Sequence, residues 1–231
     1  MIFNLLQVVD TTTLAPVAPV AQERTFSLIE MAMKGGWLML VLLILSIIAI
    51  YIFGNKWWMI RKAGKIDRNF MKDIRDMIHD GKIKSALALC QKYDSPIARL
   101  VEKGIERIGR PLPDIQAAVE NMGNVEVARL EKNLPMLATI SGGAPMIGFL
   151  GTVTGMIRAF FEMANAGNNI DITLLSGGIY EAMVTTVGGL FVGIIAYFGY
   201  NFLTSQISNL VFKMERTTIE FIDMLHEPAE N

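Results

Sequence analysis

Three long apolar runs separated by charged segments set the pattern along this chain. The run from Trp37 to Phe53 has no charged residue, the run from Leu134 to Phe161 has only Arg158, and the run from Ile172 to Phe212 has only Glu181. Each is too long for a β-strand, and none shows the alternation of polar and apolar residues typical of outer-membrane barrels. With its flanks, each reaches the roughly 20 residues that a helix needs to cross a bilayer. The pattern therefore predicts three transmembrane helices.

The charged segment between the first two runs predicts several short helices. Its apolar residues recur at helical spacing, as at Phe70, Ile74, Met77 and Ile78. Asp80-Gly81 predicts the end of one helix, and Asp94-Ser95-Pro96 predicts the start of another, because a polar cap precedes a proline.

Two of the predicted membrane helices should project beyond the membrane. After a break at Pro111–Asp114, helical periodicity continues from Ile115 through the second run, so we expect one helix of more than 40 residues, bent at Pro135 and Pro145. The third run likewise continues past Phe212 into a charged segment.

The basic residues predict the orientation. Of the 21 Lys and Arg residues, 16 lie between the first and second runs, and several follow the first run closely. Since basic residues favour the cytoplasmic side, we expect the N-terminus outside the membrane and the C-terminus in the cytoplasm. The expected organisation is an outer segment 1–27, a first transmembrane helix 28–55, a cytoplasmic helical region 56–133, a second transmembrane helix 134–161, an outer link 162–171, a third transmembrane helix 172–205 and a cytoplasmic C-terminal helix 206–231.

Composition agrees with an all-α membrane protein and excludes several other classes. Hydrophobic residues make up 52% of the chain, charged residues 19%, and the mean hydropathy is +0.40. The single cysteine, Cys90, permits no disulfide framework, and His79 and His226 lack companion metal ligands. The glycine spacing of Gly104–Arg110 lacks the Lys and Ser/Thr of a phosphate loop. We therefore expect no enzyme activity, no cofactor and no metal, and a net charge of -1 without a dense basic run gives no reason to expect nucleic-acid binding.

The N-terminal residues leave two interpretations open. The segment Met1–Val9 lacks a basic start and has a short apolar part, which favours an amphipathic outer segment over a cleaved signal peptide.

Glu181 is the first candidate for function, because an ionisable group inside a membrane is costly. If its helix begins near Ile172, Glu181 lies about 14 Å in, near the middle of the membrane, at a level where Thr152 of the antiparallel second helix should face it. The alternative is a helix that begins later, with the carboxylate at the outer interface. The hydroxyls of Thr152, Thr185 and Thr186 would either serve an ion pathway or bond only to their own backbone.

Small residues surround these positions and predict close helix packing. The motifs Gly151–Gly155 and Gly189–Gly193 each have the GxxxG spacing that lets two helix backbones approach. The residues expected to pack in this way are Pro145, Gly148, Gly151, Gly155, Gly188, Gly189 and Gly193.

These two stretches resemble a known family. The residues from Ala138 to Met156 and from Gly178 to Leu190 are together similar to the MotA/TolQ/ExbB proton-channel family, and Asp94–Arg99 adds to the likeness. Three membrane helices, in place of the four of MotA-type stators, look like ExbB or TolQ.

The resemblance implies a subunit of a proton-driven motor in the bacterial inner membrane. Five such subunits would form a ring around two helices of an ExbD-like partner, whose membrane Asp relays protons, and the motion would energise a TonB-like protein for outer-membrane import. Carried over by motif position, Thr152 and Thr186 would line the pore, and Glu181 would be the polar residue of the third helix. Thr185 is a rival to Thr186, because it is four residues from Glu181 and shares its helix face.

Other functions stay open at this point. They are a TolQ-like role in envelope maintenance, a non-conducting scaffold whose Glu181 fixes helix register, a channel that conducts without a partner, and the use of sodium in place of protons.

Overall fold

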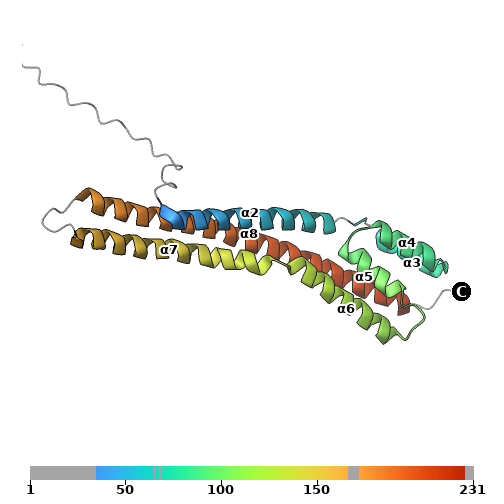
Figure 1. Cartoon of the computed structure of the whole chain (residues 1–231). Helices are drawn as coiled ribbons and strands as arrows, with labels where there is room; N and C mark the ends of the chain where they lie inside the picture. The colour runs from blue at the N-terminus through green and yellow to red at the C-terminus, as the bar shows by residue number, and fades with distance from the viewer. Residues whose placement is uncertain (1–34, 65, 68, 166–171, 227–231) are drawn as a thin grey trace, which may run out of the picture.

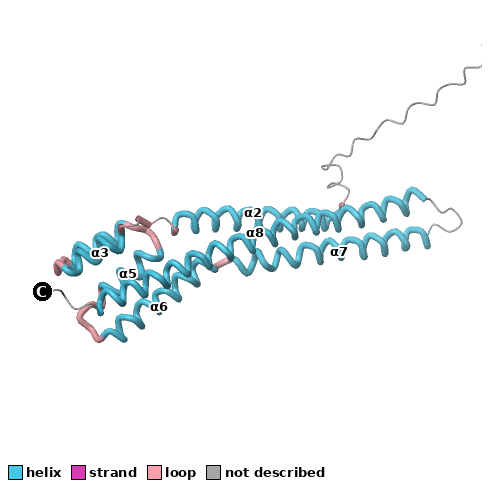
Figure 2. The backbone as a smooth tube through the Cα atoms, turned by 180° about the vertical axis from the view of Figure 1, so that it is seen from behind, coloured by secondary structure: helices cyan, strands magenta, loops and turns pink. Residues whose placement is uncertain are grey.

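The computed structural model of the chain describes residues 35–64, 66–67, 69–165 and 172–226. The expected segment 1–27 and much of the link 162–171 lie outside these residues. Within them the regular structure is entirely helical (Figures 1 and 2). The helices are α2 (Gly36–Ala63), α3 (Phe70–His79), α4 (Ile83–Lys92), α5 (Pro96–Ile105), α6 (Leu112–Glu131), α7 (Leu134–Asn165) and α8 (Ile172–His226). The predicted all-α fold is confirmed.

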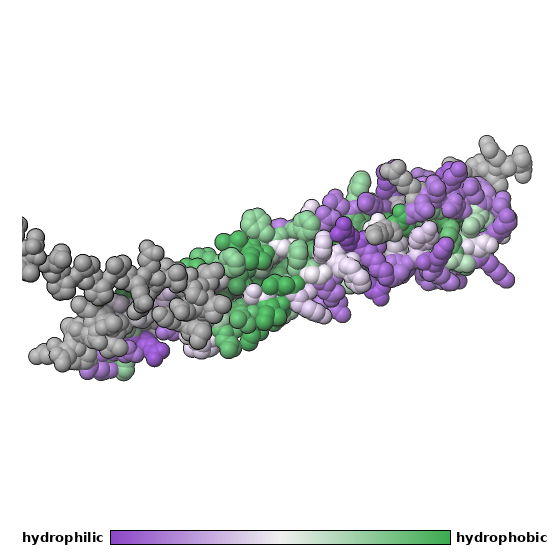
Figure 3. All heavy atoms as spheres, turned by 90° about the horizontal axis from the view of Figure 1, so that it is seen from above, coloured by the Kyte–Doolittle hydropathy of each residue, from purple (hydrophilic) through white to green (hydrophobic). Residues whose placement is uncertain are grey.

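Helices α2, α7 and α8 form an elongated bundle, and α3 to α6 gather around one end of it (Figure 1). Three helical stretches, Gly36–Ala63, Leu112–Asn165 and Leu175–His226, are long and apolar enough to cross a membrane. Figure 3 shows a hydrophobic band over the middle of the bundle and a largely hydrophilic surface at the α3–α6 end. A band of this kind suits a bilayer and confirms the three predicted membrane helices.

Helix α8 connects the two parts of the molecule. It runs unbroken for 55 residues, about 80 Å at the usual helical rise. The membrane end packs against α2 and α7, and the other end packs against α5 and α6. The expected extension of the third helix beyond Phe212 is confirmed.

The helix expected from Ile115 onward is present as the helical stretch Leu112–Asn165, but it is interrupted between α6 and α7. Helix α6 ends at Glu131, and Asn133 adopts a left-handed conformation with φ 71° before α7 begins at Leu134. Pro135 explains the break: it has no N–H to donate to the Glu131 carbonyl, and its ring would clash with that carbonyl in a continuous helix. Pro145, in contrast, lies inside α7, which continues through it.

Two helix boundaries lie where the turn residues predicted them. Helix α3 ends at His79, and Gly81 after it has φ 70°. At the start of α5, the Ser95 hydroxyl accepts a hydrogen bond from the Ala98 N–H at 3.1 Å, and Pro96 is the first helical residue. Helix α2 extends beyond the expected end of the first membrane helix at residue 55, as far as Ala63.

The core of the α3–α6 region depends on large side chains packed against α8. Phe221 of α8 is fully buried and lies directly against Gly104 of α5. Phe70 and Tyr93 pack edge to face with ring centroids 5.4 Å apart. Cys90 of α4 is also buried here, and loss of hydration, with a smaller effect of Glu102, raises the pKa of its thiol to about 12.

Burial should make Cys90 nearly inert in the folded protein. Only the thiolate reacts rapidly, so we expect maleimide at pH 7 to label Cys90 at least about a hundredfold more slowly than an exposed thiol, and to label it fully after denaturation. The matched control is Ser85→Cys, since Ser85 is exposed on the same helix. Two thiols labelled at equal rates in the folded variant would contradict this account of the α4 packing.

Candidate functional site

A seam of small residues joins α7 to α8. The two helices run antiparallel, and each contributes five small residues with the same spacing, in which successive members are four, three, four and four positions apart. All of them are buried except Gly178, which is partly exposed. They are Ala144, Gly148, Gly151, Gly155 and Ala159 on α7, and Gly178, Ala182, Thr185, Gly189 and Gly193 on α8.

The seam brings the two helix backbones into direct contact. A Cβ added at Gly148 would lie 2.9 Å from the Thr185 carbonyl oxygen, and one added at Gly189 would lie 2.6 Å from the Ala144 carbonyl oxygen. Backbone atoms cannot move aside as a flexible side chain can, so both positions require glycine. Pro145 lies in the same seam, because a Cβ at Gly193 would be 2.5 Å from its ring.

One glycine of the expected packing set belongs to a different contact. Gly188 faces α2, where an added Cβ would lie 3.0 Å from the Met39 sulfur. The other six residues of that set, Pro145, Gly148, Gly151, Gly155, Gly189 and Gly193, lie between α7 and α8.

The three candidate threonines differ in their surroundings. Thr185 is 2% exposed, lies against Gly151, and donates a hydrogen bond to the Ala182 carbonyl of its own helix at 2.8 Å. Thr186 is partly exposed and donates across the seam to the Gly148 carbonyl at 3.1 Å.

Thr152 lies outside the seam. Its hydroxyl donates to the Phe149 carbonyl of its own helix at 2.6 Å, and its side chain lines a shallow groove along α7. The remaining lining residues of this groove are Val153, Met156, Ile157 and Phe160.

Glu181 faces α2, not Thr152. Its carboxylate lies against Gly36, the first residue of α2, and Val184 and Gly188 on the same side of α8 pack against Gly35 and Met39. Among the described residues, no hydrogen bond or ion pair joins Glu181 to Thr152. The expected contact between Glu181 and Thr152 is therefore absent, because the two side chains point in different directions.

The depth of Glu181 also differs from the expectation of mid-membrane. Trp37 and Trp57, exposed at 74% and 43%, are 20 residues apart on α2, about 30 Å. Tryptophans concentrate at the two membrane interfaces, and the hydrocarbon core is roughly 30 Å thick, so these residues indicate its boundaries. Glu181 lies beside Gly36 and thus at the Trp37 end of this apolar stretch.

Glu181 lies at this level because α2 is offset along the bundle axis relative to α7 and α8. Helix α8 does begin at Ile172, as the depth estimate assumed, but α7 and α8 extend well beyond the start of α2 (Figure 1). Thr185 and Thr186 lie about one helical turn further into the apolar band than Glu181.

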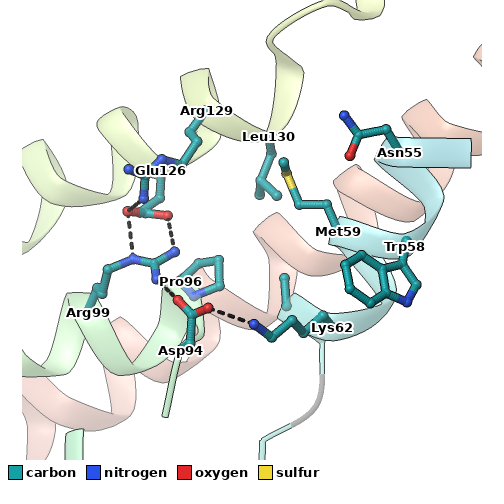
Figure 4. A pocket seen from close by; sticks show the side chains of 11 residues that line it. Asn55, Trp58, Met59, Lys62, Asp94, Pro96, Arg99, Glu126, Arg129 and Leu130 are labelled. Carbon is teal, nitrogen blue, oxygen red and sulfur yellow. Dashed lines mark hydrogen bonds and ion pairs between the residues drawn. The ribbon is translucent and has the colours of Figure 1, made fainter. Parts of the chain in front are cut away.

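A network of ion pairs joins the other end of α2 to α5 and α6 (Figure 4). Arg99 holds Glu126 with two hydrogen bonds of 2.8 and 2.7 Å and also contacts Asp94 at 2.9 Å. Asp94 in turn accepts a hydrogen bond from Lys62 of α2 at 2.9 Å. Lys62 and Arg99 hold the pKa of the Asp94 carboxyl below its usual range, and Glu126 raises the pKa of Arg99.

At the same junction, a lysine of α2 binds backbone carbonyls that the break between α6 and α7 leaves without helical partners. The ammonium group of Lys56, only 3% exposed, donates hydrogen bonds to the carbonyls of Arg129 and Leu130 at 3.1 and 3.0 Å. These carbonyls lie in the last turn of α6, where no following helical N–H reaches them. A cation there also interacts favourably with the helix dipole.

Sequence reasoning missed Glu126 and Lys56. A signal for Glu126 existed, since it shares a helix face with the buried residues Ile115, Val119 and Leu130. Lys56 had none, because its partners are backbone carbonyls more than 70 positions away.

The chain is similar in sequence to a known protein family and to several of its members. The family described as the MotA/TolQ/ExbB proton channel family matches residues 92–216. The chain is similar to the putative biopolymer transport protein ExbB-like 1 of Synechocystis sp., with 29% identity over 196 residues, 84% of this chain and 76% of that protein. It is also similar to the Tol-Pal system protein TolQ of Haemophilus influenzae, with 34% identity over 106 residues, 46% of each chain.

The seam predicts opposite effects for two glycines on α7. Gly151→Ala should lower the Tm of the purified protein, because the added methyl meets the Thr185 side chain, and such overpacking costs about 1–3 kcal/mol. Gly142→Ala should leave the Tm unchanged or raise it, since Gly142 has nothing within 4 Å and alanine favours a helix by about 1 kcal/mol. Equal shifts in Tm for the two variants would contradict the direct contact between the α7 and α8 backbones.

The ion-pair network predicts a rescue by a second substitution. Arg99→Met should destabilise the protein by about 3 kcal/mol, because it leaves the buried Glu126 carboxylate without its main partner. Arg99→Met/Glu126→Met should recover most of that loss, since no unpaired charge is then buried. Thermal unfolding measures both, and a double variant that is no more stable than Arg99→Met would contradict the assignment.

Proposed function

Because this chain belongs to the MotA/TolQ/ExbB proton channel family, we propose that it is an ExbB-like subunit of an inner-membrane motor driven by proton flow. With an ExbD-like partner inside a ring of five copies, it energises a TonB-like protein for outer-membrane import. The matched residues 92–216 include α5, α6, α7 and most of α8, and therefore the whole seam.

The observation that carries this proposal is the position of Glu181. It is the only formal charge between Ile172 and Phe212, and it lies half-buried near the Gly178 end of the seam between α7 and α8. A carboxylate there exchanges protons with the outer side, and each proton that crosses the membrane releases ~2.3 kcal/mol per 100 mV.

The surroundings of the threonines support Thr186 over Thr185 as a residue of the pathway. Thr185 is enclosed between two helices, whereas Thr186 is partly exposed and Thr152 lines an open groove. In the proposed motor Thr186 and Thr152 line the pore around the partner's helices, and the partner supplies the principal proton carrier.

Exposed apolar surface supports an assembly with other membrane helices. Large hydrophobic side chains on both helices of the seam are exposed, among them Phe149 and Ile157 on α7 and Phe191 on α8. Lipid covers part of this surface, and in the proposed ring neighbouring copies and the partner cover the rest.

The charges near the end of α2 support the proposed orientation. Arg61 and Lys62 lie in its last turn, beyond the exposed Trp57. By the positive-inside rule, the α3–α6 region then lies in the cytoplasm with the C-terminus, and Glu181 faces the periplasm.

A TolQ-like role in envelope maintenance is the second candidate, supported by the similarity to TolQ of Haemophilus influenzae. The two roles differ in which partner the motor drives. Complementation of a host that lacks both ExbB and TolQ separates them, because restored TonB-dependent uptake without restored envelope integrity supports the ExbB-like role.

Glu181→Gln tests the proton role. It keeps the shape and hydrogen bonding of the side chain but cannot exchange a proton, so energised uptake should fall to the level of a strain without the chain. Protein abundance and ring assembly, measured in the same membranes, should not change. A passive scaffold would retain uptake in the Glu181→Gln variant, and that result would refute the proposal.

The two neighbouring threonines provide a matched pair. Thr186→Val should lower energised uptake, and because it also removes the hydrogen bond to the Gly148 carbonyl, the Tm should fall modestly. Thr185→Val should mainly change Tm, because its side chain packs against Gly151. Normal uptake with Thr186→Val would remove this residue from the pathway.

A further inference from the structure

Gly36 and Glu181 are in unusually close contact. Gly36 begins α2, and an oxygen of the Glu181 carboxylate occupies the space where a Cβ at Gly36 would be. The carboxyl carbon would lie 3.3 Å from that Cβ, and Cγ would lie 3.9 Å from it. Any side chain at position 36 therefore displaces the carboxylate.

The backbone at Gly36 independently favours glycine. Its φ is +65°, in the left-handed region that other residues rarely adopt. Gly81 and Gly109 also have positive φ values, 70° and 94°, but nothing lies within 4 Å of a Cβ added at either position. Among the described glycines, only Gly36 combines a left-handed backbone with contact to an ionisable side chain.

The neighbouring contacts hold this arrangement in register. Val184, three residues after Glu181, lies 3.4 Å from the Cβ position of Gly35, and Gly188 lies against Met39. One side of α8 thus packs along the first two turns of α2. The position of Glu181 consequently depends on where α2 begins.

We propose that Gly36 is a positioning residue for Glu181. Its bare Cα lets the carboxylate lie on the first turn of α2, where backbone N–H groups without helical partners favour negative charge. This inference rests on the proposed proton role of Glu181 and adds α2 to the pathway. In this proposal α2 holds the carboxylate of Glu181 in place and so contributes directly to the proton pathway.

Gly36→Ala is the central variant, and two other glycines provide its controls. Gly81→Ala introduces the same left-handed strain in open space, and Gly54→Ala adds a methyl to α2 in open space. Gly36→Ala should lower energised uptake by about tenfold or more, as expected for a displaced reacting group, at normal abundance and assembly. Both controls should retain uptake. Uptake with Gly36→Ala that equals the Gly81→Ala value would overturn the inference.

A double variant separates positioning from general damage to α2. Glu181→Asp shortens the side chain by one methylene and makes room for the added methyl. Uptake by Gly36→Ala/Glu181→Asp should therefore exceed the product of the two single effects by several-fold. Purely multiplicative effects would mean that the two residues act independently and would contradict the proposal.

Loss of the folded protein would still give an answer. If Gly36→Ala lowers abundance more than Gly81→Ala does, then Gly36→Ala/Glu181→Ala should restore it to the Gly81→Ala level, because the displaced side chain is gone and only the backbone strain remains. Failure to restore it would overturn the inference. Glu181→Gln distinguishes the two roles: full uptake with that variant refutes the proton role, whereas lost uptake with a normal Gly36→Ala refutes only the positioning role.

Discussion

Direct backbone contact between α7 and α8 is the constraint on which the rest of the structure depends. Helices usually keep roughly 8–10 Å between their axes because side chains stand between them. Here small residues at matching positions remove that spacing, and carbonyl oxygens of one helix meet Cα atoms of the other. In a membrane, where lipid is as apolar as the side chains, such close packing is the main source of helix association. The seam determines which sides of α7 and α8 stay available for other contacts.

Helix α2 is held at its two ends by different chemistry, against α8 at one end and against α5 and α6 at the other. At its first turn, glycines let Glu181 and Val184 approach the backbone. At its other end, Lys56 binds the last carbonyls of α6, and Lys62 joins the ion pairs of Asp94 and Arg99. The break at Asn133 makes the Lys56 contact possible, because a continuous helix would have used those carbonyls itself. The α3–α6 region is therefore coupled to the membrane bundle by polar groups as well as by the long α8.

Sequence patterns predicted elements better than they predicted which elements touch. The three apolar runs, the caps at Ser95 and Gly81 and the continuation of α8 followed from local preferences, which act over a few residues. The break between α6 and α7 was missed because Pro135 was expected to bend the helix, whereas it ends one. The glycine motifs indicated close packing but could not assign Gly188 to α2, because periodicity describes the faces of one helix and not their partners.

The sequence by itself determined the class of the protein, its three membrane helices, and the fact that Glu181 is isolated in an apolar run. Hydrophobicity, helical periodicity and the cost of a charge in lipid are properties of short segments, so composition and order are sufficient for these conclusions. Only the tertiary structure decided that Glu181 lies against Gly36 at the level of Trp37, that Thr185 is enclosed, and that Glu126 and Lys56 carry the junction. These features depend on the offset and rotation of one helix against another, which arise from packing between residues distant in sequence.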